Sequence, residues 1–222
     1  IWKTWTIPTY QTQKTKNKMC GIVYIHRKDG KPAYKSVLKR YRNQKSRGMQ
    51  GYGYIAVKDN KIVSLKRATT EHEIIKLIEQ EDAPEILFHH RNPTSAPNIE
   101  ETTHPIAVHN QELKHQYYVA HNGVIRNSDE LKKKHEENGY EYFTELDNSF
   151  RAKGSGKTYY IGTSKWNDSE SLAIEVARAL EGTTDEIDTE GPAAVIGFKT
   201  IGQDIVGRFF FRNDLNPLKY MD

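Results

Sequence analysis

The sequence contains a single cysteine, Cys20, among its 222 residues, so no disulfide can form within the chain. The cysteine content therefore gives no reason to expect a secreted protein, and it suits a reducing, cytoplasmic environment. No uninterrupted apolar run approaches the roughly 18 residues that a membrane-spanning helix needs. We expect a protein that does not cross a membrane and that keeps its one thiol reduced.

A strong excess of charge of one sign is also missing, because 33 basic residues stand against 29 acidic ones. Proteins that bind nucleic acid usually concentrate basic residues on one face, so this balance predicts no specific nucleic-acid partner. The chain has no P-loop, no dinucleotide-binding fingerprint and no set of zinc-binding cysteines. We therefore expect neither a cofactor nor a metal.

Residues 1–18 differ from the rest of the chain in being polar, basic and rich in threonine, glutamine and lysine. They lack the apolar centre of a signal peptide, and they are interpreted as an N-terminal arm or a pro-segment. Residues 19–222 are expected to form one domain. Within it, the polar stretch 146–165 is interpreted as an inserted loop or hairpin.

The spacing of apolar residues predicts an α+β fold in which strands pair in antiparallel hairpins with helices between them. Strands are expected at 22–26, 54–57, 62–65, 86–88, 117–120, 193–198 and 205–211. The last two are apolar enough to be covered on both faces. Helices are expected at 33–44, 71–81, 129–138 and from 167 or 168 to 180, with Ser128 capping the third.

Cys20 stands at the start of the first expected strand, where a lone cysteine can simply pack as a small hydrophobic residue. The alternative is a nucleophile. A thiol needs a base for this role, and the α-amine of the same cysteine serves when the cysteine is the first residue of the chain. Removal of everything through Met19 would create that amine.

Four further residues offer groups that suit an amide-cleaving site. Asn122 and Gly123, at the end of a strand, offer an amide and a backbone N–H to an oxyanion, although an Asn-Gly pair is also a common turn. Arg91 can bind a carboxylate through two hydrogen bonds, or it can form a surface ion pair. Asp168 can bind an ammonium group, or it can cap a helix.

Together and in this order, the motifs of the chain resemble the glutaminase domain of class II glutamine amidotransferases, which are N-terminal nucleophile hydrolases. The resemblance covers the sequence from Met19 to the end. The motifs are Cys20 Gly21 Ile22, Arg47 Gly48, His90 Arg91 with Thr94, His104 Pro105, His121 Asn122 Gly123, Asp168 Ser169 Glu170, and Arg212 Asn213 Asp214 before Pro217 Leu218.

The resemblance implies a four-layer αββα sandwich and a cysteine that attacks the side-chain amide of glutamine. Ammonia leaves, and water hydrolyses the glutamyl thioester. By resemblance, Cys20 is the nucleophile, its free α-amine is the general base, and Asn122 with the Gly123 N–H forms the oxyanion hole.

The resemblance also assigns the residues that hold the substrate. Arg91, helped by Thr94, would bind the α-carboxylate of glutamine, and Asp168 would bind its α-amino group. Arg47 would lie close to the nucleophile and order the loop around it.

The sequence departs from the family pattern in several places. Gln50 stands where an acidic residue is usual, and the glycine expected between Asn92 and Asn98 is missing. The segment between Glu145 and Trp166 is longer than expected. Because the chain ends at Asp222, soon after the last motif, we expect the ammonia acceptor to be a separate synthase or a protein assembly.

Two other functions stay open at this point. In one, the fold is catalytically silent, and the retained arm grips a partner or a larger assembly through Trp2, Trp5 and Tyr10. In the other, the nucleophile acts on a different amide or on a peptide. Arg91 and Asp168 favour an amino-acid substrate over that second alternative.

Overall fold

The structure is a computed structural model that describes residues 20–92, 96, 98–145, 149–151, 158–160, 166–213 and 216. The predictions made for residues 1–19, for Thr94 and for most of 146–165 lie outside this part of the chain. The Pro217 Leu218 motif lies outside it as well.

Eight antiparallel strands form one hydrogen-bonded sheet in the order β1-β4-β2-β3-β10-β9-β6-β5. Their bounds are β1 (Gly21–His26), β2 (Gln50–Lys58), β3 (Lys61–Ala68), β4 (Glu85–Arg91), β5 (Ile106–Val108), β6 (Gln116–Gly123), β9 (Ala193–Ile201) and β10 (Asp204–Arg212). Within this sheet, β3 and β10 are joined through the residue pair Lys61 and Asp204. This junction divides it into a first half, β1 to β4, and a second half, β5, β6, β9 and β10.

The two halves pack against each other through an apolar cluster to which both contribute. Ile55 and Leu87 come from the first half, and Ala120 and Phe198 come from the second half. Since burial of apolar side chains is the main stabilising contribution to folding, this cluster holds the two halves together.

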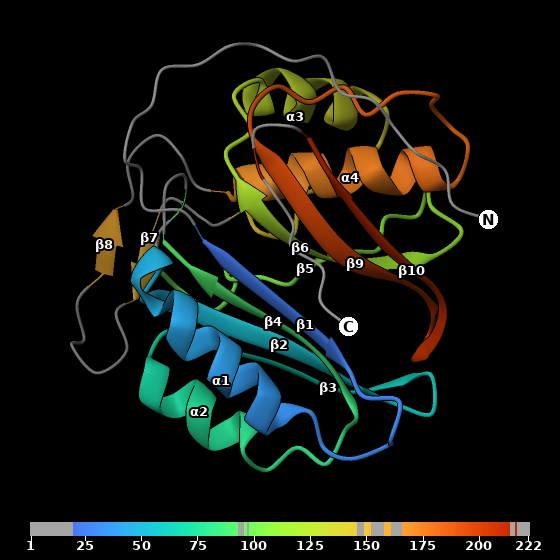
Figure 1. Ribbon diagram of the computed structural model, residues 1–222. Helices are drawn as coiled ribbons and strands as arrows, with labels where there is room; N and C mark the ends of the chain where they lie inside the picture. The colour runs from blue at the N-terminus through green and yellow to red at the C-terminus, as the bar shows by residue number, and fades with distance from the viewer. Residues whose placement is uncertain are drawn as a thin grey trace.

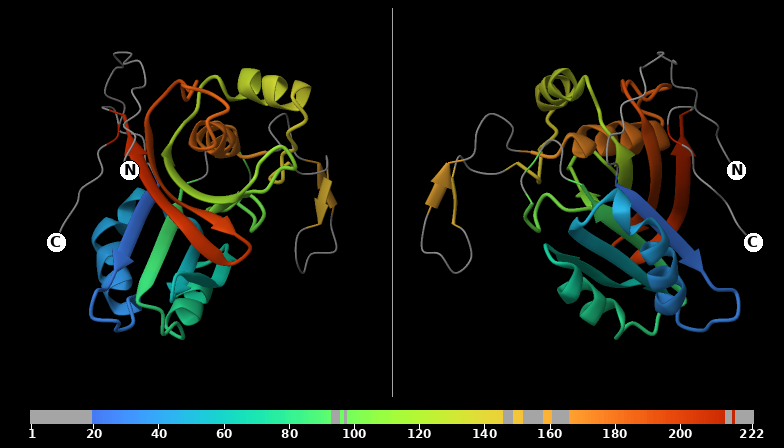
Figure 2. Two further views of the ribbon diagram at one scale, coloured as in Figure 1. Left: turned by 90° about the vertical axis from the view of Figure 1, so that its right-hand side faces the viewer. Right: turned by 60° about the vertical axis from the view of Figure 1, so that its left-hand side comes forward.

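Each half carries a pair of helices on its other face (Figures 1 and 2). Helices α1 (Tyr34–Gln44) and α2 (Glu71–Ile78) share an apolar cluster with β1, β2 and β4, and a 3₁₀ turn at Lys45–Arg47 follows α1. Helices α3 (Ser128–Glu137) and α4 (Asp168–Leu180) share another with β5, β6 and β9. The fold is therefore α+β, as predicted.

The predicted strands and helices are present, and most differ from the prediction only in their ends. The helix expected at 71–81 ends earlier, at Ile78. Within the stretch expected to be an insertion, β7 (Ser149–Arg151) pairs with β8 (Thr158–Tyr160) in a separate two-stranded sheet. No helix in the described ranges is long and apolar enough to cross a membrane.

Two local predictions are wrong. Strand β10 is not covered on both faces, because Phe209 and Phe211 pack on the core of the second half, whereas Phe210 points the other way and is 56% exposed. The N-cap of α3 is Asn127, not Ser128. The Asn127 side chain makes no capping bond and instead accepts from Glu190 N–H at 2.9 Å and donates to the Asp188 carbonyl at 3.2 Å.

Candidate functional site

Cys20 lies beside the end of β4 because β1 and β4 are antiparallel neighbours, with Gly21 opposite His90. Its Sγ accepts a hydrogen bond from Asn92 N–H at 3.4 Å and lies 3.8 Å from the Asn92 carbonyl oxygen. Burial raises the pKa of the Cys20 thiol, and the Asn92 N–H and the charge of Arg91 offset part of that rise. The thiol is therefore in its neutral form at neutral pH and needs a base in order to act as a nucleophile.

The Arg-Gly motif lies against both Cys20 and β4. Arg47 Nε donates a hydrogen bond to the Cys20 carbonyl oxygen at 3.1 Å. A Cβ on Gly48 would come within 2.6 Å of the Arg91 backbone, so only glycine fits this approach without displacement. The Gly48 carbonyl also accepts a hydrogen bond from His90 Nδ1 at 2.7 Å.

Arg91, the last residue of β4, is only 2% exposed, so it does not form a surface ion pair. Its Nη1 donates to Thr102 Oγ1 at 2.9 Å, and its Nη2 donates to the Ala96 carbonyl at 3.0 Å. Burial lowers the pKa of Arg91, whereas the thiol of Cys20 and the carboxylate of Asp168 act in the opposite direction. The guanidinium thus lies within electrostatic range of both groups.

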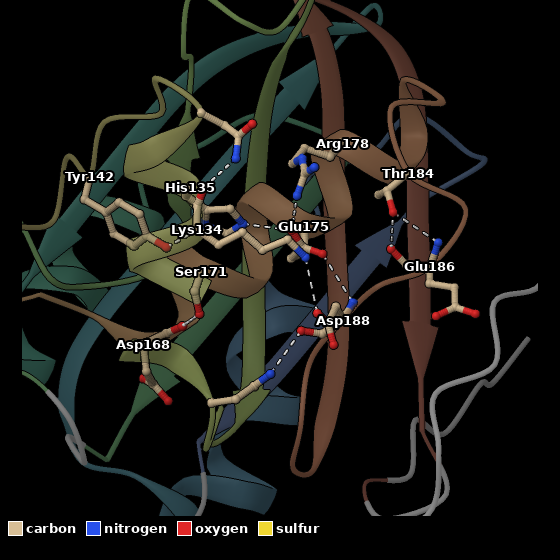
Figure 3. Close-up of polar contacts among 12 residues, drawn as sticks. Lys134, His135, Tyr142, Asp168, Ser171, Glu175, Arg178, Thr184, Glu186 and Asp188 are labelled. Atoms are coloured by element: carbon tan, nitrogen blue, oxygen red, sulfur yellow. Dashed lines mark hydrogen bonds and ion pairs between the residues drawn. The ribbon is translucent and has the colours of Figure 1, made fainter. Parts of the chain in front are cut away.

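Asp168 is the first residue of α4, but Asn167 caps this helix by accepting a hydrogen bond from Ser169 N–H at 3.0 Å. Asp168 is not the capping residue. One of its carboxylate oxygens accepts from the Ile125 backbone N–H at 2.9 Å. Ser171 Oγ donates to the main-chain carbonyl of Asp168 at 2.7 Å (Figure 3). Asp168 is therefore a buried carboxylate held in place at its helix end.

Asn122 and Gly123 are the last two residues of β6 and pair with Ala194 and Ala193 of β9. They belong to a strand and do not form an isolated Asn-Gly turn. The Asn216 side-chain amide donates to the Asn122 carbonyl oxygen. A Cβ on Gly123 would lie 1.7 Å from the carbonyl oxygen of Pro192, so the end of β6 is tightly enclosed.

The structure thus places most of the predicted site residues in one region. Cys20, Arg91 and Asp168 interact electrostatically, although they come from the start of β1, from β4 and from α4. Asn122 and Gly123 lie just before Ile125, whose backbone N–H donates a hydrogen bond to Asp168. Their strand, β6, also contacts β1, which follows Cys20. Arg47 is attached to the Cys20 carbonyl, and Thr94 lies outside the described residues.

Sequence reasoning assigned no role to several residues that support this group, although His121 and Ser169 lie within its motifs. Thr102 contacts Arg91, and its own carbonyl accepts a hydrogen bond from Asn167 Nδ2 at 2.7 Å. His121 Nδ1 shares a hydrogen bond with Ser169 Oγ at 2.8 Å. Asn167 had a detectable signal, because it was one of two candidate helix starts. Thr102 had none, since it lies in an irregular segment without apolar periodicity.

Three buried histidines lie next to the site. The rings of His89 and His104 stack with centroids 4.2 Å apart, and His104 lies 6.5 Å from His121. Burial lowers the pKa of all three, so these rings are neutral at neutral pH. Over the described ranges, no group of three or more histidine, cysteine or acidic side chains has a geometry that could hold a metal ion.

The chain matches no protein-family model. It is nevertheless related in sequence to a class II glutamine amidotransferase, which confirms the resemblance that its motifs predicted. That relative is the glutamine–fructose-6-phosphate aminotransferase [isomerizing] of Aquifex aeolicus (strain VF5), which is 28% identical over 194 residues. The match covers 85% of this chain but only 31% of the relative.

Two solved structures are also similar. One is a glutamine phosphoribosylpyrophosphate amidotransferase from B. subtilis complexed with ADP and GMP, at 16% identity and a TM-score of 0.45. The match covers 81% of this chain and 34% of that structure. The other is an allosteric regulatory enzyme of purine biosynthesis, at 16% identity and a TM-score of 0.44. That match covers 82% of this chain and 35% of that structure.

Proposed function

We propose that this protein is a glutamine amidotransferase that hydrolyses the side-chain amide of glutamine to glutamate and ammonia once Cys20 is the first residue of the chain. The observation that carries the proposal is the grouping of a thiol, a buried guanidinium and a buried carboxylate in Cys20, Arg91 and Asp168. An α-amino acid offers a carboxylate to the guanidinium and an ammonium group to the carboxylate.

We further infer that the two halves of the eight-stranded sheet and their helix pairs form a four-layer αββα sandwich of the N-terminal nucleophile hydrolase type. The three apolar clusters support this arrangement, because one lies between the halves and one lies under each helix pair. In this fold, residues 19–222 are one domain and 146–165 are an insertion.

The substrate is bound at its α-carbon end. Arg91, with help from Thr94, binds the α-carboxylate, and Asp168 binds the α-ammonium group. Both protein groups are almost fully buried, so they are poorly screened by water, and two charged contacts orient the side-chain amide toward Cys20.

The reaction begins when the free α-amine of Cys20 takes the thiol proton and Sγ attacks the amide carbon of the substrate. The negative charge that develops on the amide oxygen is stabilised by the Asn122 side chain and the Gly123 N–H. The carbon–nitrogen bond then breaks, the amine returns the proton to the leaving ammonia, and water hydrolyses the thioester. Arg47 keeps Cys20 in position through its backbone carbonyl.

In the sequence as given, residues 1–19 precede Cys20 and would convert its amine into an amide that is no longer a base. We therefore propose that this segment is a pro-segment removed at the Met19–Cys20 bond. The ammonia would pass to a synthase or to an assembly, in a reducing, cytoplasmic compartment. The same segment is also the observation that favours a second function, a silent fold that uses residues 1–18 as an arm in an assembly.

The experiment is an intact-mass measurement of the purified protein, followed by incubation with a glutamine analogue that carries an electrophile. A chain that begins at Cys20, gains one adduct and produces glutamate supports the amidotransferase. Cys20→Ala should then abolish both the adduct and the activity. A chain that begins at Cys20 but gains no adduct and produces no glutamate overturns the proposal.

An unlabelled chain that still begins at Ile1 favours the silent fold. In that case, deletion of residues 1–18 should disrupt assembly in size-exclusion chromatography, and Cys20→Ala should leave assembly unchanged.

A further inference from the structure

Two buried side chains connect Arg91 to Asp168. Thr102 accepts a hydrogen bond from Arg91 Nη1 through its hydroxyl, at 2.9 Å, and accepts another from Asn167 Nδ2 through its carbonyl, at 2.7 Å. Asn167 in turn caps α4 by accepting from Ser169 N–H at 3.0 Å, and Asp168 lies between these two residues. A continuous hydrogen-bonded path therefore runs from the guanidinium to the helix end that carries the carboxylate.

This path has little freedom to move. Thr102 is fully buried, and Asn167 is 1% exposed. The backbone N–H of Asn167 also donates to Thr144 Oγ1 at 2.9 Å, which fixes the cap from a second side. Buried polar groups whose hydrogen bonds are made hold one geometry, because any displacement leaves a group unpaired in a medium of low dielectric constant.

We propose that Thr102, together with Asn167, is a positioning residue that fixes the separation between the Arg91 guanidinium and the Asp168 carboxylate. The path then selects ligands whose carboxylate and ammonium group are attached to the same carbon. This inference rests on the proposed function, because it takes these two groups as the ones that hold glutamine. Thr102 acts through Arg91 and does not itself touch the reacting atoms.

Thr103 provides a matched control. It is the next residue, it is also fully buried, and its hydroxyl donates to the Ile99 carbonyl at 2.7 Å. The Thr102 hydroxyl donates to the same carbonyl at 3.3 Å, but it also accepts from Arg91. Thr103→Val therefore removes a similar buried hydroxyl without removing the Arg91 contact.

The test measures glutamine binding by calorimetry on the chain that begins at residue 20, with Cys20→Ala in every protein so that glutamine is not hydrolysed. This chain serves as the wild type and is compared with Thr102→Val, Thr102→Ser and Thr103→Val. Loss of a hydrogen bond to a charged group should raise the dissociation constant of Thr102→Val about 10-fold or more. Thr102→Ser keeps the hydroxyl, so it and Thr103→Val should stay within about 3-fold of the wild type.

A second readout separates positioning from general destabilisation. The preference for glutamine over β-homoglutamine, whose two charged groups are on neighbouring carbons, should fall in Thr102→Val and be unchanged in Thr103→Val. If Thr102→Val does not fold, Asn167→Asp takes its place, because an aspartate keeps the capping oxygen but loses the donor to Thr102.

The outcomes are distinct. A wild type that binds glutamine, with Thr102→Val or Asn167→Asp binding equally well, overturns this inference and leaves the proposed function standing. The same holds if Thr103→Val weakens binding as much as Thr102→Val. A wild type that binds no glutamine overturns the proposed function, and this inference with it.

Discussion

The carboxylate of Asp168 accepts a hydrogen bond from the backbone N–H of Ile125 at 2.9 Å. Ile125 comes two residues after Gly123, so this bond connects the start of α4 to the segment that leaves β6. The same carboxylate is the proposed partner of the substrate ammonium group. It therefore has a structural contact and a proposed binding contact that mutation can separate.

Replacement of Asp168 by asparagine should separate the two contacts. Asparagine keeps an oxygen that can accept from Ile125 but has no charge for an ammonium group. We expect the dissociation constant for glutamine to rise about 10-fold or more, with little change in the thermal unfolding midpoint. Asp168→Ala should lower both affinity and stability. Calorimetry that finds wild-type affinity in Asp168→Asn would exclude the assigned role.

The Cys20 thiol should react slowly at neutral pH in the chain that retains residues 1–19. Burial raises its pKa above the ordinary value of 9.0, so the thiolate fraction grows only at higher pH. The rate of alkylation by iodoacetamide should therefore reach half of its maximum above pH 9.0, the pH at which a thiol of ordinary pKa is half ionised. A half-maximal rate at or below pH 9.0 would show that the pKa of Cys20 is not raised.

Substitution of Gly123 by alanine should disturb the end of β6. The new Cβ would lie 1.7 Å from the Pro192 carbonyl oxygen, and a backbone atom cannot move aside cheaply. We expect a loss of about 1–3 kcal/mol in the free energy of unfolding, measured with urea, and a loss of the proposed glutaminase activity.

Gly207→Ala is the control for this substitution, because the nearest atom to its Cβ would be Lys199 Cβ at an ordinary 3.4 Å. The expected change in its free energy of unfolding is within about 0.5 kcal/mol. Equal destabilisation by the two substitutions would contradict the steric argument.

The buried contacts between α3 and α4 should make stability depend on pH (Figure 3). Glu175 accepts hydrogen bonds from His135 at 2.8 Å, from Arg178 at 2.6 Å and from Asp188 N–H at 3.2 Å. Burial raises the pKa of Glu175, but these hydrogen bonds and the Arg178 charge outweigh burial, and the pKa lies below its ordinary 4.5. The carboxylate therefore stabilises the fold fully above pH 4.5, and this contribution is lost as the pH falls through the lowered pKa.

Glu175→Gln should consequently be less stable than the wild type by about 1–3 kcal/mol at pH 7 in urea unfolding, and the difference should shrink in acid. Glu136→Gln is the control, because it removes only a half-exposed partner of Lys132 and should change little. A difference for Glu175→Gln that stays constant down to low pH would refute the pKa argument.

The regular elements could be predicted because their apolar residues follow a single period. In α1, Val37, Leu38 and Tyr41 recur at helical spacing, and all three are buried. In β10 the period is hidden, since Phe209, Phe210 and Phe211 are all apolar and only the fold determines which of them faces the core. An apolar run alone therefore does not show how many faces of a strand are covered.

The candidate site was predictable to the extent that its residues have distinctive chemistry. Cys20, Arg91 and Asp168 could be selected by residue type and by position at the ends of elements. Thr102 and Asn167 could not be linked in the same way, because the hydrogen bond between them depends on how the segment after β4 packs against the start of α4. Contacts of that kind arise only from tertiary structure.

The division of the sheet into two halves links the assembly of the candidate site to the completion of folding. Cys20 and Arg91 belong to the first half, whereas Asn122 and Asp168 belong to the second half and its helices. Neither half alone brings these groups together. If the proposed removal of residues 1–19 depends on these groups, the Cys20 amine is released only after folding is complete, and an incompletely folded or misfolded chain keeps that amine blocked.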